Sequence, residues 1–339
     1  MYKYLLPLLI LAACKEPSVP QIEEKSNVAY VVSGVGKQVD VIDLIGHTVV
    51  ETYPLQVSSD RFPHHIYISD DKRKLAIATP AYDFSKGHSG LHGLEVPGGI
   101  KVLDADTGEE LMNIAVPFAN HNATFSRDGN EIWTSVFSHS GRAHIHNAER
   151  GNAVGEVILD ADPSEIIITP DGKYAAVASG ESTFLQLINT SSRQLEKRIK
   201  VDLAPSNVWP GYGDIVLVSN ALRKSVNFVN LASFNVTDFI DFDFVPGFVI
   251  YNKSRAELWV CEGAGGKVHI FKKDPEWSEV GTLSFPDEDP HMIKFYDQDK
   301  QALLITQQSS KVYFINSETR EITGSVAVGA KPNGIAIKE

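Results

Sequence analysis

No long stretch of this sequence carries an apolar stripe of period 3.6 bounded by helix caps, so helices should be few or absent. No block of lysine and arginine stands out either, and the formal net charge is -12. Both features argue against a nucleic acid as the partner. No linker-like stretch interrupts the chain beyond its first residues, which favours one domain although 339 residues could hold two.

What the sequence does contain is a repeat. A short anchor of the form Pro-x-x-apolar-x-apolar-x-polar recurs seven times, at a spacing of roughly 42 residues. Each copy continues with four alternating or apolar runs separated by turn residues, which predicts four strands, named A to D from the anchor onward. A repeat of this length and content is typical of a propeller blade. The anchors begin at Pro63, Asn120, Pro163, Pro205, Pro246, Pro290 and Pro332.

The chain starts in the middle of a blade. Residues 28–32, 39–42 and 49–53 have the character of strands B, C and D, and the missing strand A is found at the far end, over residues 333–337. We therefore predict an all-β fold over residues 27–339, a seven-bladed β-propeller of four-stranded blades. The C-terminal strand would join the N-terminal blade and close the ring, which removes an open sheet edge.

The first residues do not belong to the repeat. A short positive region and an apolar run, residues 5–10, are followed by Leu11-Ala12-Ala13-Cys14. This arrangement resembles a bacterial lipoprotein signal peptide, and the apolar run is too short to span a membrane. The resemblance implies a signal peptide over residues 1–13 and a lipid on Cys14, with a flexible tether over residues 14–26. An ordinary secretory signal is the alternative. We therefore expect a protein of the cell envelope that is anchored to a bacterial membrane and faces the periplasm or the exterior. We also expect it to be a monomer.

Cysteine is scarce, with two residues in the chain. If Cys14 carries lipid, no internal disulfide can form, and Cys261 stands alone. Cys261 ends a predicted strand B at a position that serine or threonine holds in the other blades. We therefore predict a buried, inert thiol rather than a ligand or nucleophile.

The strand B sequence Tyr30-Val31-Val32-Ser33 resembles the consensus of the YVTN family of seven-bladed propellers. The anchors and the Asp171-Gly172 turn extend this resemblance over nearly all of residues 27–339. It implies the propeller fold but not an activity, because propellers of this type serve as enzymes, cofactor carriers and binding modules.

Histidine holds the second anchor position in three of the seven copies, as His64, His121 and His291. Every strand A starts at the same face of a propeller, so these residues and His65 should gather there near the central opening. Blade order places His291, Asn333, His64 and His121 in four neighbouring blades, whereas the opposite arc carries Ser164, Ser206 and Gly247. The sequence therefore predicts an off-centre site on this face.

Two loops between strands B and C should reach the same face. The loop after the first anchor is longer than the others by roughly 14 residues and contains His88 and His92. The loop of the next blade contains His139. An insertion confined to one loop favours a functional role. Seven of the eleven histidines map to this face in total.

Several imidazoles without thiolates suit a transition metal, with copper favoured and zinc or iron possible. Three or four histidines suffice for a mononuclear site. Adjacent strand residues point to opposite sides, so His64 and His65 are not expected to face one ion together. The alternatives are a site for a polar small molecule or an envelope protein, or purely structural histidines. The predicted metal ligands are His64, His65, His88, His92, His121, His139 and His291, and the predicted cofactor-binding residues are His64, His121, His291 and Asn333.

The histidine ring with its His64-His65 pair also resembles the copper-cluster propeller of nitrous oxide reductases, although this chain lacks their cupredoxin domain. It is similar to the propellers that handle haem d1 as well, which implies haem as a second possible cofactor. Seven-bladed lactonases resemble the same architecture, so a hydrolase is a further alternative. Its general base would come from Asp83, Glu95, Glu262 or Glu288.

Overall fold

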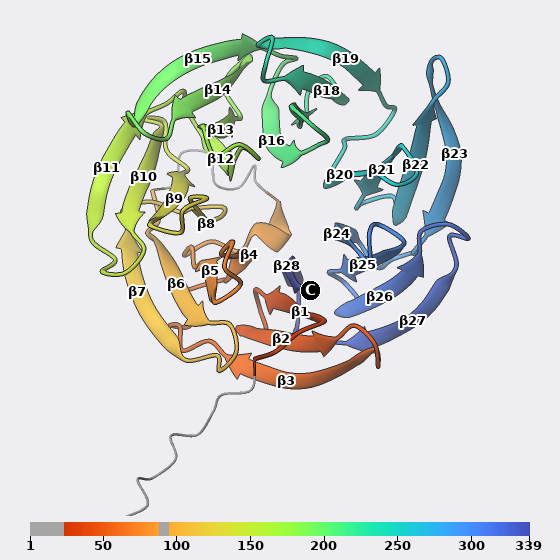
Figure 1. Cartoon of the computed structure of the whole chain (residues 1–339), viewed down its shortest axis with the longest axis horizontal. Helices are drawn as coiled ribbons and strands as arrows, with labels where there is room; N and C mark the ends of the chain where they lie inside the picture. Colours follow the sequence, from red (N-terminus) through yellow and green to blue (C-terminus); the bar gives the residue numbers. More distant parts are fainter. Residues whose placement is uncertain (1–23, 88–94) are drawn as a thin grey trace, which may run out of the picture.

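The computed structural model, described over residues 24–87 and 95–339, is a ring of seven four-stranded antiparallel sheets (Figure 1). The predicted all-β, seven-bladed propeller is therefore confirmed. Within the described residues, the only helical element is one short 3-10 turn, η1 (Phe84–Lys86). No helix in that part of the chain has the length and hydrophobicity needed to cross a membrane.

Each sheet runs from an innermost strand A to an outermost strand D, and its strands are paired in chain order except in the sheet that contains both ends of the chain. The innermost strands are β4 (His64–Ile68), β8 (Thr124–Phe125), β12 (Pro163–Ile168), β16 (Pro205–Pro210), β20 (Val249–Asn252), β24 (Pro290–Tyr296) and β28 (Pro332–Lys338). The B strands are β1 (Val28–Ser33), β5 (Lys74–Ala78), β9 (Glu131–Val136), β13 (Tyr174–Ser179), β17 (Ile215–Asn220), β21 (Glu257–Glu262) and β25 (Gln301–Thr306).

The C strands are β2 (Gln38–Asp43), β6 (Gly98–Asp104), β10 (Arg142–Asn147), β14 (Phe184–Asn189), β18 (Ser225–Asn230), β22 (Lys267–Lys273) and β26 (Lys311–Asn316). The outermost strands are β3 (Thr48–Pro54), β7 (Glu110–Val116), β11 (Ala153–Ile158), β15 (Gln194–Lys200), β19 (Asn235–Asp241), β23 (Trp277–Ser284) and β27 (Ile322–Ala327). The outermost strands β3 and β15 are largely exposed, with one buried residue each, whereas β1 and β13 are buried along their whole length.

The ring closes as the sequence predicts. Strand β28 pairs with β1, and β2 and β3 complete that sheet. The ladder joins Val28 to Lys338 at one end and Val32 to Gly334 near the other. The two ends of the chain therefore share one blade, and β1 has a partner on both sides.

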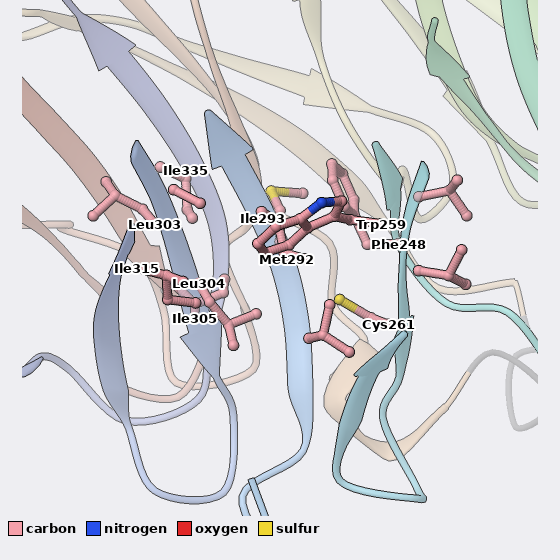
Figure 2. Close-up of a cluster of buried hydrophobic side chains, with 14 of the residues drawn as sticks. Phe248, Trp259, Cys261, Met292, Ile293, Leu303, Leu304, Ile305, Ile315 and Ile335 are labelled. Carbon is pink, nitrogen blue, oxygen red and sulfur yellow. The ribbon is translucent and has the colours of Figure 1, made fainter. Parts of the chain in front are cut away.

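The core lies between neighbouring blades, where the sheets pack face to face. Figure 2 shows the part of it around Trp259 and Met292, from adjacent blades. The Trp259 side chain is fully buried, and its ring lies 5.3 Å from that of Phe295. Cys261 is buried in the same cluster, and burial raises the pKa of its thiol. The prediction of a buried cysteine is therefore confirmed, and a thiol held in its neutral form is a poor nucleophile.

One irregularity recurs at the anchors. Where strand A meets strand B, the ladder shifts register at the second or third anchor position in five of the seven blades. In β4 the shift falls between His64 and Ile66, and His65 has a φ of 41°. A bulge of this kind re-aims side chains, so that two consecutive residues can face the same side. The expectation that His64 and His65 point to opposite sides is therefore wrong.

Candidate metal centre

Four of the predicted histidines form one cluster around the inner strands. His64 and His65 begin β4, His121 lies just before β8, and His291 is the second residue of β24. The ring centroids of His64, His65 and His121 lie 4.3 to 4.5 Å apart, and that of His291 lies 6.3 Å from His64. His64, His65 and His291 each offer one ring nitrogen, and these three nitrogen atoms lie within 4.8 Å of one another. The structure thus brings together the residues that the anchor pattern singles out.

The cluster is enclosed. His64, His65 and His121 are each exposed by no more than 2%, and His291 is partly buried. Phe84 of η1 covers two of them, with its ring 4.8 Å from that of His64 and 5.0 Å from that of His121. In Figure 1 this short turn projects toward the central opening. The start of the long B-to-C loop therefore forms part of the site.

Hydrogen bonds fix the tautomers of two histidines. Nδ1 of His64 lies 2.9 Å from the backbone oxygen of His121, which can only accept, so this nitrogen carries the proton. Nδ1 of His121 lies 2.7 Å from Oε2 of Glu165 and donates to that carboxylate. The Nε2 atoms of both rings therefore keep their lone pairs, which is how histidines are prepared for a metal.

Glu165 is the centre of this network, and it is not among the site residues predicted from the sequence. Its carboxylate is fully buried on β12, and Oε1 accepts a hydrogen bond of 2.6 Å from the Tyr67 hydroxyl. Oε2 also lies 3.2 Å from Nδ1 of His65, although this pair does not have the geometry of a hydrogen bond. The Asn122 amide donates a hydrogen bond to the backbone C=O of Ile166 and accepts one from its N–H. It therefore stabilises the backbone next to Glu165.

Burial and mutual proximity set the protonation states. Burial, followed by the neighbouring imidazoles, holds the pKa of His64 and of His121 below the usual range. The same causes lower the pKa of His291 to about 3. Burial alone would raise the pKa of Glu165, but His65 and His121 outweigh it and lower the pKa. At neutral pH His64, His121 and His291 are therefore neutral imidazoles beside an ionised carboxylate.

Two further inner-strand residues complete the surroundings. The Trp209 ring of β16 lies 6.0 Å from the His65 ring, and Lys294 of β24 is partly buried. Burial lowers the pKa of Lys294, and Glu165 opposes this effect. Contacts such as Tyr67 to Glu165 and His65 to Trp209 join blades that are not neighbours, so they span the central opening.

A sequence signal for these residues exists. Glu165, like His65, holds the third anchor position, and Tyr67, Trp209 and Lys294 hold the fifth. The sequence prediction started from residues at the second anchor position. The bulge turns the residue at the third anchor position toward the opening as well.

The remaining predicted residues lie elsewhere or are engaged differently. His139 is exposed and belongs to a separate group with Asp162 and Glu181. His88, His92 and Cys14 lie outside the described residues. The Asn333 amide donates to the backbone oxygen of Pro63 at 3.0 Å and accepts from Gln307, so it supports the anchor that carries His64. A ligand role for Asn333 stays a prediction.

The carboxylates considered as general bases have partners of their own. Asp83 caps η1, Glu262 lies 3.0 Å from His269, and Glu288 accepts from Tyr313 and Ser309. Glu95 is exposed. The carboxylate that contacts the histidine cluster is Glu165 instead.

Acid should destabilise the metal-free protein well before its carboxylates titrate. Below pH 6.5 an unfolded histidine binds a proton that native His291 does not, so stability falls as the pH falls. This difference is worth up to about 2 kcal/mol at pH 5 for His291 alone. Urea unfolding at pH 7.5 and 5.0 measures the loss, and H291Q should reduce it. Equal stability at both pH values would contradict the expectation.

A search of protein-family models finds no match to this chain, and a search of curated proteins finds none either. Solved structures do match. The dihydro-heme d1 dehydrogenase NirN, in complex with DHE, is 14% identical with a TM-score of 0.67, covering 95% of this chain and 77% of that one. Hydrazine synthase of Kuenenia stuttgartiensis is 18% identical with a TM-score of 0.66, covering 82% and 90%.

The periplasmic gluconolactonase PpgL of Pseudomonas aeruginosa is 14% identical with a TM-score of 0.71, covering 92% of this chain and 99% of that one. Such low identities show a shared propeller fold and nothing finer, because one fold hosts many functions. Membership of the YVTN family stays a prediction.

Proposed function

We propose that this protein is a lipid-anchored propeller of the cell envelope that binds a transition-metal ion through the histidine cluster. His64, His65 and His291 would hold the ion, with His121 as a further imidazole beside it. The observation that carries the proposal is the pair of tied Nδ1 atoms, on His64 and His121, which leaves two neutral Nε2 atoms available in a buried site.

The donor set favours copper, with zinc or iron as possible alternatives, because imidazole suits all three and copper(II) binds most tightly among them. Phe84 packs against His64 and His121, and this close cover favours a bare ion over a haem. A bound ion would supply Lewis acidity or, for copper and iron, electron transfer. The protein's own groups would hold the imidazoles in one tautomer and keep water away from them.

Elemental analysis and an absorption spectrum test the proposal. The protein to use is residues 15–339, expressed in a bacterial envelope, beside a variant with His64, His121 and His291 all changed to Ala. We expect near-stoichiometric metal in the natural sequence and none in the triple variant. H291A serves as a milder change because that residue is only partly buried. His144 of strand β10, changed to Ala, is the control that should keep the metal.

Absence of metal from the natural protein, before and after reconstitution, would contradict the proposal. A haem spectrum would instead favour the tetrapyrrole. Labelling with a lipid precursor, compared with a Cys14→Ala variant of the full chain, tests the anchor separately.

A further inference from the structure

Beside the histidines, a tryptophan presents a donor with nothing to bind. Trp209 is 3% exposed, and its Nε1 has no hydrogen-bond partner among the described residues. The centroid of its ring lies 6.0 Å from that of His65 and 4.5 Å from that of Phe248. A buried donor left unpaired destabilises the folded state, so native proteins rarely leave one without an acceptor.

A lysine borders the same aromatic ring. The Lys294 Nζ lies 5.7 Å from the centroid of Phe248, which is labelled in Figure 2. Lys294 makes no hydrogen bond or ion pair that the described part of the chain shows. Trp209 and Lys294 come from β16 and β24, so they approach from different blades. Both donors border the Phe248 ring and lack acceptors among the described residues, which makes them candidates for binding a negatively charged group.

A nearby asparagine on the same strand as Trp209 could supply a third donor. The Oδ1 atom of Asn207, two residues before Trp209 on β16, is also buried without a partner. Rotation of this amide by half a turn exchanges its oxygen for the NH₂ group, which donates.

The balance of charge near the histidine cluster also favours an anion. Glu165 contributes one negative charge and Lys294 one positive charge, and a histidine binds a metal ion as the neutral imidazole. A divalent metal on the histidines would therefore leave two positive charges in excess. Buried charges are normally paired, so this excess of positive charge favours the binding of an anion nearby.

We propose that Lys294 and Trp209 bind a small monovalent anion next to the histidine-bound metal. This inference rests on the proposed function and extends it, since it names the class of ligand that the metal site accepts. The anion would receive hydrogen bonds from the indole Nε1–H and the ammonium group. Met292 and Phe248 are apolar neighbours within the same core cluster, which strengthens the attraction by lowering the local dielectric.

Azide is the probe, and calorimetric titration of residues 15–339 is the measurement, on metal-loaded and metal-free protein. The variants are K294M, which keeps the length of the side chain, and W209F, which keeps a ring but removes the donor. We expect K294M to weaken azide binding at least about 10-fold, and W209F about 3-fold or more, with the metal content unchanged. The exposed Lys300, changed to Met, is the matched control and should leave binding unaltered.

The outcomes separate the two proposals. Metal-loaded protein that does not bind azide, or folded K294M and W209F variants that bind it as tightly as the natural sequence, would overturn the anion site. If the protein holds no metal, the proposed function fails. In that case, azide binding that K294M abolishes would still support the anion site, and its absence would overturn it as well.

Discussion

Replacing Glu165 by Gln should weaken metal binding about 10- to 100-fold without removing any proposed ligand. The carboxylate accepts hydrogen bonds from His121 at 2.7 Å and Tyr67 at 2.6 Å, and it is fully buried. A glutamine carries no charge and has one acceptor oxygen instead of two, so it holds the His121 tautomer less firmly and the imidazoles become poorer ligands. Competition with a chromophoric chelator measures the affinity of E165Q against the natural sequence.

The chain offers a close control for this change. Glu288 also accepts from a tyrosine hydroxyl, that of Tyr313 at 2.7 Å, and makes none of the described contacts with the histidine cluster. E288Q should therefore bind metal as the natural protein does. If folded E165Q retained full affinity, Glu165 would have no part in preparing the site. E165A should be worse than E165Q, because it leaves two buried donors unpaired at a cost of roughly 1–3 kcal/mol each.

Removal of residues 330–339 is expected to abolish the folded monomer. The deletion takes away β28, including the buried Ile335, and exposes the edge of β1 along its whole length. It also removes Asn333, which supports the anchor of His64. The lost ladder and apolar burial are comparable with the entire stability of an ordinary domain, about 5–15 kcal/mol. Circular dichroism and gel filtration should show a protein that is unfolded or aggregated.

A circular permutant separates ring closure from the contacts themselves. Placing residues 330–339 ahead of Val28, joined by an Asp-Gly turn like that at Asp171-Gly172, makes the four strands of this blade continuous. This protein should fold and retain the histidine cluster, because every contact of β28 is restored. A truncated chain that unfolds with the cooperativity of the full protein would show that β28 contributes little.

The fold could be predicted because its signals are local. The anchors, the turn residues and the missing first strand A all follow from spacing, and the histidines of the second anchor position follow from which blades are neighbours. Ring closure needed no contact information either, since the unmatched runs at the two ends of the chain complement one another.

The arrangement of side chains in the site could be predicted only in part from the sequence. A positive φ at His65 is a property of the bulge, and strict alternation along a strand predicts the opposite orientation. The contacts of Glu165 with Tyr67 and His65 cross the ring, so they depend on its inner radius rather than on distance along the chain. Phe84 needed a folded loop to bring it over His64.

The repeated bulge makes the propeller a convenient scaffold for engineering. Because several blades carry this bulge at the anchor, Ser164 and Ser206 are sites at which new ligands could be introduced while the sheets stay unchanged. Histidine at Ser164 and Ser206 would continue the ring of imidazoles toward the blades that now lack them. A propeller that binds two metal ions could then be selected by varying a few anchor residues while the rest of the fold is kept.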